Sequence, residues 1–170
     1  MKTINILLLA TTLLLTSCSN KMIKQLEDNS EHFAKLQQTQ KMALMQNSEV
    51  YALLSATYLQ TKVAKRYRAT AKDRKRGEKF IVGLFFSDQN ATIEDANITL
   101  NNQKPLKVKK LERGDKRLKD IPLLNSWSSY YLLKFKHINK KSVKLKFEVE
   151  GVGKKKKKFY KVARYLLQAK

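Results

Sequence analysis

From residue 78 onward, hydrophobic and polar positions alternate along the chain with a period of two, which is typical of strands with one buried face. The clearest stretch is 142–150, where the apolar side chains predicted to face inward are Val143, Leu145, Phe147 and Val149. Similar short segments, separated by turn residues, predict strands at 79–86, 98–101, 105–111, 130–136 and 158–166. Residues 48–60 fit a helix and a strand alike, and we interpret them as a strand because the β pattern that follows needs a partner.

Six or seven short strands within one domain of ordinary size favour an antiparallel β-sandwich. Their order and spacing resemble an immunoglobulin- or fibronectin-type domain, without a Cys…Trp…Cys core, and we place this domain with its basic loops at residues 48–166. Trp127 is expected in the core, although with Tyr130 and Tyr131 it could instead form a stacking platform for sugar rings or bases. The phenylalanines expected in the core are Phe80, Phe85, Phe86, Phe135 and Phe147.

A helix is predicted ahead of the sandwich. Residues 22–46 contain no Gly or Pro and are rich in Gln, Lys, Leu, Met and Ala, which favour helices. Ile23, Leu26, Phe33 and Leu36 fall near helical spacing, and Asp28 with Glu31 matches a capping box. We therefore interpret residues 18–47 as an N-terminal helix or tether.

The first eighteen residues predict export and a lipid anchor. Lys2 is followed by an apolar stretch over 4–15, which fits a signal peptide and is too short to span a bilayer. The sequence Leu-Thr-Ser-Cys that ends at Cys18 resembles the lipobox of bacterial lipoproteins. That resemblance implies a signal peptide of residues 1–17, a lipid on Cys18 and anchoring in the membrane. The alternative is an ordinary secretory signal with an incidental cysteine. Ser19 favours the outer membrane, on its periplasmic face or at the surface.

Two segments read D-x-N-x-T, one around Asn90 and the other around Asn97. Both resemble the acceptor sequon of the bacterial oligosaccharyltransferase, which implies N-linked glycan at these two asparagines. Because Asn90 follows a strand and Asn97 precedes one, Asn90 is expected to be the better acceptor. The alternative is that both are solvated turn residues that the enzyme never modifies.

The charge is concentrated in the C-terminal two-thirds. The chain carries 36 basic and 14 acidic residues, for a net charge of +22, and residues 80–103 form an acidic island without a basic side chain. The lysine run 154–158 is predicted to lie in a hairpin loop, either as a solvated loop or as a grip for phosphates. The second anion-binding candidate is the segment 62–79. The candidate residues are Arg66, Arg68, Arg74, Arg76, Lys154, Lys155, Lys156, Lys157 and Lys158.

Composition and motifs argue against catalysis. The chain has one cysteine and two histidines, with no nucleophile elbow, P-loop or metal-ligand spacing, so we expect no enzyme, metal, cofactor or small-molecule substrate. The leading hypothesis is a membrane-anchored envelope lipoprotein that binds or assembles with another envelope protein. The alternative is a binder of anionic polymer, such as lipopolysaccharide, a cell-wall polymer or DNA, and salt dependence separates the two.

Overall fold

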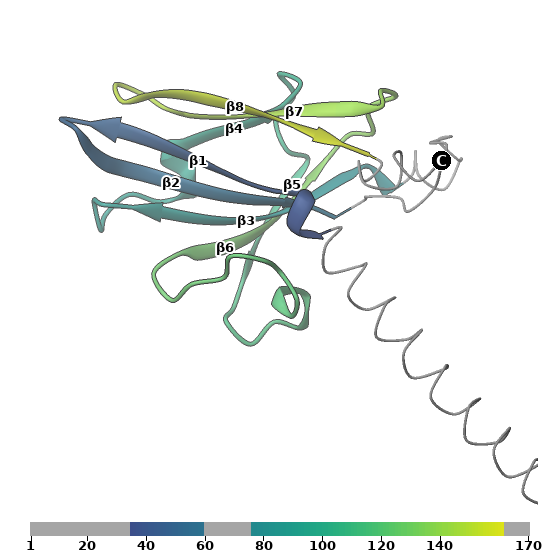
Figure 1. The fold of residues 1–170 in the computed structure, drawn as a ribbon, viewed down its shortest axis with the longest axis horizontal. Helices are drawn as coiled ribbons and strands as arrows, with labels where there is room; N and C mark the ends of the chain where they lie inside the picture. The colour runs from purple at the N-terminus through teal and green to yellow at the C-terminus, as the bar shows by residue number, and fades with distance from the viewer. Residues whose placement is uncertain (1–34, 60–75, 162–170) are drawn as a thin grey trace, which may run out of the picture. The chain divides into compact units, whose positions relative to one another are not determined.

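The computed structural model describes residues 35–59 and 76–161, and within them the chain is mainly β. Two antiparallel sheets lie face to face in a sandwich-like arrangement (Figure 1). The five-stranded sheet has the order β1-β2-β3-β6-β5, and the three-stranded sheet has the order β4-β7-β8. The strands are β1 (Thr39–Gln46), β2 (Glu49–Tyr58), β3 (Glu78–Phe86), β4 (Ala96–Leu100), β5 (Lys107–Leu111), β6 (Ser129–Phe135), β7 (Ser142–Val149) and β8 (Gly153–Tyr160).

One hydrophobic core joins the two sheets. Alternate side chains of β2, β3 and β6 meet those of β4, β7 and β8, because a half-buried strand turns every second residue toward the partner sheet. Phe80, Phe147 and Phe159 lie at its centre, and the Phe80 and Phe159 rings pack edge to face with centroids 5.1 Å apart. The predicted inward face of residues 142–150 is confirmed, since Val143, Leu145, Phe147 and Val149 are all buried.

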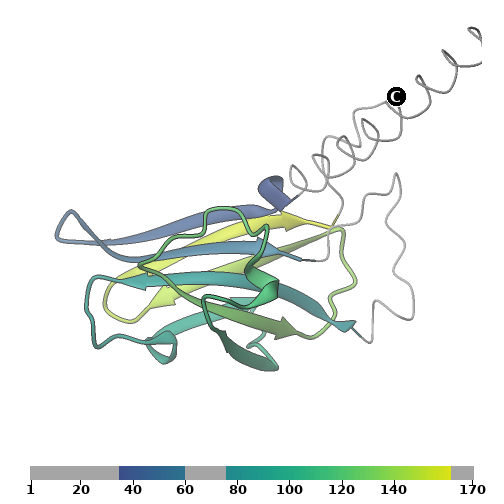
Figure 2. The same ribbon diagram turned by 90° about the horizontal axis from the view of Figure 1, so that it is seen from below.

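A smaller second core lies on the outer face of the five-stranded sheet. The connection from β5 to β6 folds back over this face, as the view from below shows (Figure 2). Ile81, Leu111, Leu118 and Tyr130 are buried there. Tyr130 crosses Gly83, where a Cβ atom would lie 2.7 Å from the Tyr130 ring and 2.7 Å from Ser55 Oγ. Glycine at position 83 therefore makes room for the aromatic ring that anchors the connection.

Three sequence-based interpretations of the fold need correction. The helix predicted over 22–46 is wrong for residues 39–46, which form β1; the helical residues described there are 35–37, and 22–34 lie outside the described residues. The lysine run 154–158 lies within β8 and not in a loop, so the returning strand starts earlier than residue 158. Trp127 is 54% exposed and is not a core residue. Residues 48–60, in contrast, do contain the predicted strand, β2.

A buried ionic cluster closes one end of the sandwich. Glu78, at the start of β3, and Lys161, directly after β8, are fully buried, and Lys161 Nζ donates to Glu78 Oε1 over 2.5 Å. Tyr58 OH donates to Glu78 Oε2 over 2.6 Å, and the backbone N–H of Ile138 donates to Glu78 Oε1 over 3.0 Å. His137 Nδ1 lies 3.0 Å from the same oxygen. The cluster thus connects β2, β3, the β6–β7 connection and the end of β8.

Lys161→Ala is expected to lower the free energy of unfolding by about 3–5 kcal/mol, because it leaves the Glu78 carboxylate buried without its cation. Urea denaturation of the full-length protein in non-ionic detergent measures this loss. The matched control is Lys146→Ala, which removes the solvent-accessible pair with Glu148 and is expected to change the unfolding free energy far less, because solvent screens such a pair. Equal losses in the two variants would contradict the importance of the buried cluster.

Candidate functional site

The outer face of the β4-β7-β8 sheet carries a two-dimensional array of lysines. In the pairing of β7 with β8, Lys144 lies opposite Lys158, Lys146 opposite Lys156, and Glu148 opposite Lys154. Because side chains alternate across a strand, these residues share the face that points away from the core. We call Lys144, Lys146, Lys154, Lys156 and Lys158 the lysine face.

The apolar residues of β7 and the end of β8 determine this arrangement. Val143, Leu145 and Phe147 point into the core, so Lys144 and Lys146 must point outward. Phe159 pairs with Val143 and is buried, which sets the same register for the lysine run in β8. Lys155 and Lys157 take the opposite side of β8, where they remain exposed at the sheet edge. Of the five predicted lysines, three therefore join the lysine face.

Like charges face one another on this surface at close range. Directly opposed residues of an antiparallel pair have Cβ atoms about 4.5–5.5 Å apart, and like charges there destabilise the pair. A single carboxylate, Glu148, offsets them: Lys146 Nζ lies 2.5 Å from its Oε2 and holds the pKa of Glu148 below its ordinary value. Lys158 lies over the ring of Tyr160, with Nζ 4.8 Å from the ring centroid. In the pairing of β7 with β8, Lys144 and Lys156 lie opposite lysines, whereas Lys154 lies opposite Glu148.

A hollow of about 380 Å³ indents the lysine face next to the β4 turn. Four lysines and three polar residues line it, which are Lys140, Lys144, Lys146, Lys156, Asn101, Asn102 and Ser142. Several ammonium groups around one hollow suit an oxyanion such as a phosphate, since each contributes a charge and several hydrogen-bond donors. The row of lysines along β8 could in the same way bind several anionic groups of one polymer.

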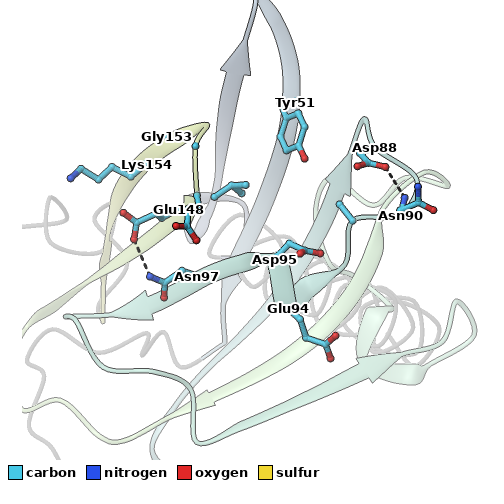
Figure 3. A pocket seen from close by; sticks show the side chains of 13 residues that line it. Tyr51, Asp88, Asn90, Glu94, Asp95, Asn97, Glu148, Gly153 and Lys154 are labelled. Atoms are coloured by element: carbon cyan, nitrogen blue, oxygen red, sulfur yellow. Dashed lines mark hydrogen bonds between the residues drawn. The ribbon is translucent and has the colours of Figure 1, made fainter.

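An acidic hollow of about 1010 Å³ lies at the end of the sandwich remote from Glu78 (Figure 3). Five of the 14 acidic residues line it, together with Tyr51 and Lys154. The β3–β4 connection supplies Asp88, Glu94 and Asp95, and the end of β7 and the turn after it supply Glu148 and Glu150. The lysine face therefore borders a region of opposite charge at Glu148 and Lys154.

Both sequon asparagines line this acidic hollow, in different surroundings. Asn90 is exposed in the β3–β4 connection, where its backbone N–H donates to Asp88 Oδ1 over 2.9 Å. Asn97 lies in β4, and its Nδ2 donates to Glu148 Oε2 over 2.9 Å (Figure 3). Thr99, the hydroxyl residue of the second sequon, is buried, whereas Thr92 of the first is exposed at the start of a 3₁₀ turn, Ile93–Asp95.

Of the other residues predicted for lipid attachment or anion binding, the structure describes one. Cys18, Arg66, Arg68 and Arg74 lie outside the described residues, and Arg76 is exposed just before β3. Lys144 and Lys146 were missed as site residues, although their outward position was predicted. The period of two in 142–150 could have identified them if it were visible in the lysine run as well. Five identical residues show no such alternation, so the sequence does not reveal which lysines share a face.

Within 35–59 and 76–161, no three His, Cys, Asp or Glu side chains gather closely enough to hold a metal ion. In the same part of the chain, no helix has the length and apolarity needed to cross a membrane. Comparison of the chain with models of protein families, with curated proteins and with solved structures finds no significant match.

Lys144→Glu is expected to raise the free energy of unfolding by about 0.5–1 kcal/mol, because it places a carboxylate opposite Lys158 in place of a like charge. Urea denaturation at low salt measures the gain, which should shrink as salt is added. Lys110→Glu makes the same charge change opposite Tyr131 and should leave stability nearly unchanged. A loss of stability in Lys144→Glu would show that the lysine array is not self-repelling.

Proposed function

We propose that this protein is a lipid-anchored envelope protein whose β domain binds an anionic polymer through the lysine face. The observation that carries the proposal is the cross-strand register, which sets lysine against lysine on an exposed sheet. An isolated sheet loses stability from such pairs, whereas phosphate or carboxylate groups between them turn repulsion into attraction. Phosphorylated lipopolysaccharide and acidic cell-wall polymers are ligands of this class.

The finer identity of the fold is part of this proposal. The order β2-β3-β6-β5 in one sheet and β4-β7-β8 in the other corresponds to the order ABED and CFG of an immunoglobulin constant-type domain. This correspondence supports an immunoglobulin-like sandwich, with β1 as an additional edge strand. In such a domain the β3–β4, β5–β6 and β7–β8 connections gather at one end, which is where the acidic hollow lies.

The envelope location rests on the lipobox-like sequence that ends at Cys18. Two or three acyl chains on this residue would hold the protein at the membrane stably, whereas one chain binds only marginally. Cys18→Ala is expected to give an uncleaved precursor whose electrophoretic mobility does not shift when lipoprotein processing is blocked. A variant that is processed normally and released as soluble protein would show that Cys18 is incidental.

Polymer binding is tested with a variant in which four residues of the lysine face, Lys144, Lys154, Lys156 and Lys158, are replaced by glutamine. Each ammonium near an anionic surface contributes about 1 kcal/mol, so this variant should bind long-chain polyphosphate and lipopolysaccharide at least ~10-fold more weakly. A matched control replaces the exposed lysines 104, 107, 110 and 119, which removes the same charge elsewhere. Binding of full-length protein is measured by light scattering and anisotropy.

Binding by the unsubstituted protein should fall steeply between about 50 and 200 mM salt. Equal weakening in the variant and the control would mean that net charge, and not the lysine face, attracts the polymer, and it would overturn the proposal. Binding that does not respond to salt would overturn it as well.

Docking of another envelope protein is the second candidate function, and the exposed edge strand β5 favours it. Leu106 and Val108 are exposed at 69% and 45%. Val108 lines a groove of about 370 Å³ together with Pro105, Ile93 and Ile98. Because an edge strand has unpaired backbone groups, an extended segment of a partner can add to it. Such an interface would persist at high salt, which separates it from binding at the lysine face.

In a host that carries the bacterial glycosylation pathway, Asn90→Gln is expected to remove more glycan than Asn97→Gln. The amide nitrogen of Asn97 is already hydrogen-bonded to Glu148 and Thr99 is buried, so the second sequon is harder to present after folding. Intact-mass spectrometry of the native protein and both variants measures occupancy. An unmodified native protein, from a host that glycosylates other exported proteins, would refute glycosylation, and a larger loss with Asn97→Gln would refute the ranking.

A further inference from the structure

A second cleft, of about 310 Å³, lies on the five-stranded sheet where β3 ends. The aromatic rings of Phe85, Trp127 and Tyr131 line it, with Asp88, Gln89 and Ser129 as polar partners. Trp127 contacts Phe85 edge to face, with ring centroids 5.3 Å apart and planes at 84°. This contact leaves 54% of Trp127 exposed to solvent. An indole held at the mouth of a cleft is a stacking surface.

The connection that carries Trp127 is fixed on both sides of the residue. The N–H of Ser128 donates to Asn125 Oδ1 over 2.8 Å, and the N–H of Asn125 donates to Tyr130 Oη over 2.7 Å. Arg113 Nη2 also donates to the carbonyl of Ser126 over 2.5 Å. Leu118 and Tyr130 are buried in the smaller core and pack the connection against the sheet. The exposed indole is therefore presented by a packed and hydrogen-bonded segment, which reduces the entropy that a ligand must overcome.

The charge of the cleft selects among ligands that stack on aromatic rings. Although the protein carries a net charge of +22, the described residues that line this cleft include no lysine or arginine, and Asp88 is the one carboxylate among them. A nucleotide would stack on the indole, but its phosphates would find no cation there and would meet Asp88. A neutral pyranose avoids this repulsion: its C–H face packs on the indole, and its hydroxyl groups can donate to Asp88 and Gln89.

We propose that the Trp127 cleft binds a neutral sugar, with the indole stacking on a pyranose ring and Asp88 and Gln89 hydrogen-bonding its hydroxyl groups. This site is separate from the lysine face, which lies on the other sheet, and does not depend on the proposed binding of polyanions. Asp88 is anchored for this role, since its Oδ1 accepts from the N–H of Asn90 and fixes the turn that presents Gln89.

The chain has one tryptophan, so its fluorescence reports on this cleft directly. Full-length protein in a polyoxyethylene detergent, which has no sugar head group, is titrated with maltotriose and with N,N′,N″-triacetylchitotriose. At least one of these neutral probes should shift the emission saturably. Trigalacturonate should not, because Asp88 repels it. No saturable shift with either neutral probe up to ~10 mM would overturn the proposal. A saturable shift of the Trp127 emission at lower concentrations of trigalacturonate than of the neutral probes would overturn it as well.

Substitutions locate the contact. Gln89→Ala and Asp88→Ala should each raise the half-saturating sugar concentration at least ~10-fold, about 1.4 kcal/mol. Gln103→Ala makes the same truncation as Gln89→Ala at an exposed turn outside the cleft and should bind as the unsubstituted protein does. Variants of Trp127 lack the fluorescent residue, so calorimetry measures their sugar binding. Trp127→Phe should bind more weakly, and Trp127→Ala should not bind. Unchanged affinity in the Asp88 and Gln89 variants would overturn the proposal. The variant with four lysines of the lysine face replaced by glutamine should bind sugar as the unsubstituted protein does.

Discussion

The buried carboxylate of Glu78 is the interaction on which the position of β8 depends. A strand of five consecutive lysines has little apolar surface to hold it, and within Gly153–Tyr160 one side chain, Phe159, is buried. Directly after this strand, Lys161 carries its ammonium group into the interior and meets Glu78. A buried charge without its partner is costly, so Glu78 and Lys161 confine the end of β8 to one place. Phe159 then sets which lysines face outward.

This dependence couples the stability of the domain to its proposed binding surface. The Glu78 cluster fixes β8 from one end, while two opposed lysine pairs, Lys144 with Lys158 and Lys146 with Lys156, repel one another between β7 and β8. Stabilising substitutions on the lysine face are therefore expected to be those that weaken polymer binding. A surface that gains stability when its own charge is removed is typical of residues kept for binding and not for folding.

The strands whose apolar residues alternate could be predicted from the sequence. The strand that depends on pairing with its neighbour, β1, could not. β7 was recognisable because Val143, Leu145 and Phe147 repeat with a period of two. β1 was mistaken for a helix, since residues 39–46 are good helix formers, but pairing with β2 overrides that preference and buries Met42 and Leu44. The turn residues Asn47 and Ser48, at φ of 50° and 68°, were the local signal of this hairpin.

The candidate sites were harder to predict because they depend on register and on how one connection folds back. Five identical lysines carry no periodicity, so only the pairing with β7 reveals which of them share a face with Lys144. Trp127 precedes a core strand and was expected inside, yet Tyr130 and Leu118 fill the small outer core in its place. Gly83, which admits the Tyr130 ring, gave no sign of this role in the linear sequence.

The two proposed sites have complementary chemistry. The lysine face offers cations, with Tyr160 beside it as an aromatic ring. The Trp127 cleft offers aromatic rings, and the described residues that line it include no cation. A polymer that alternates neutral sugars with phosphates or carboxylates would match both. The sites lie on different sheets, so a polymer chain long enough to reach from one to the other can occupy both. Once one site is occupied, binding at the other takes place at a high effective concentration. Neither site then needs high affinity alone for the domain to hold such a polymer firmly.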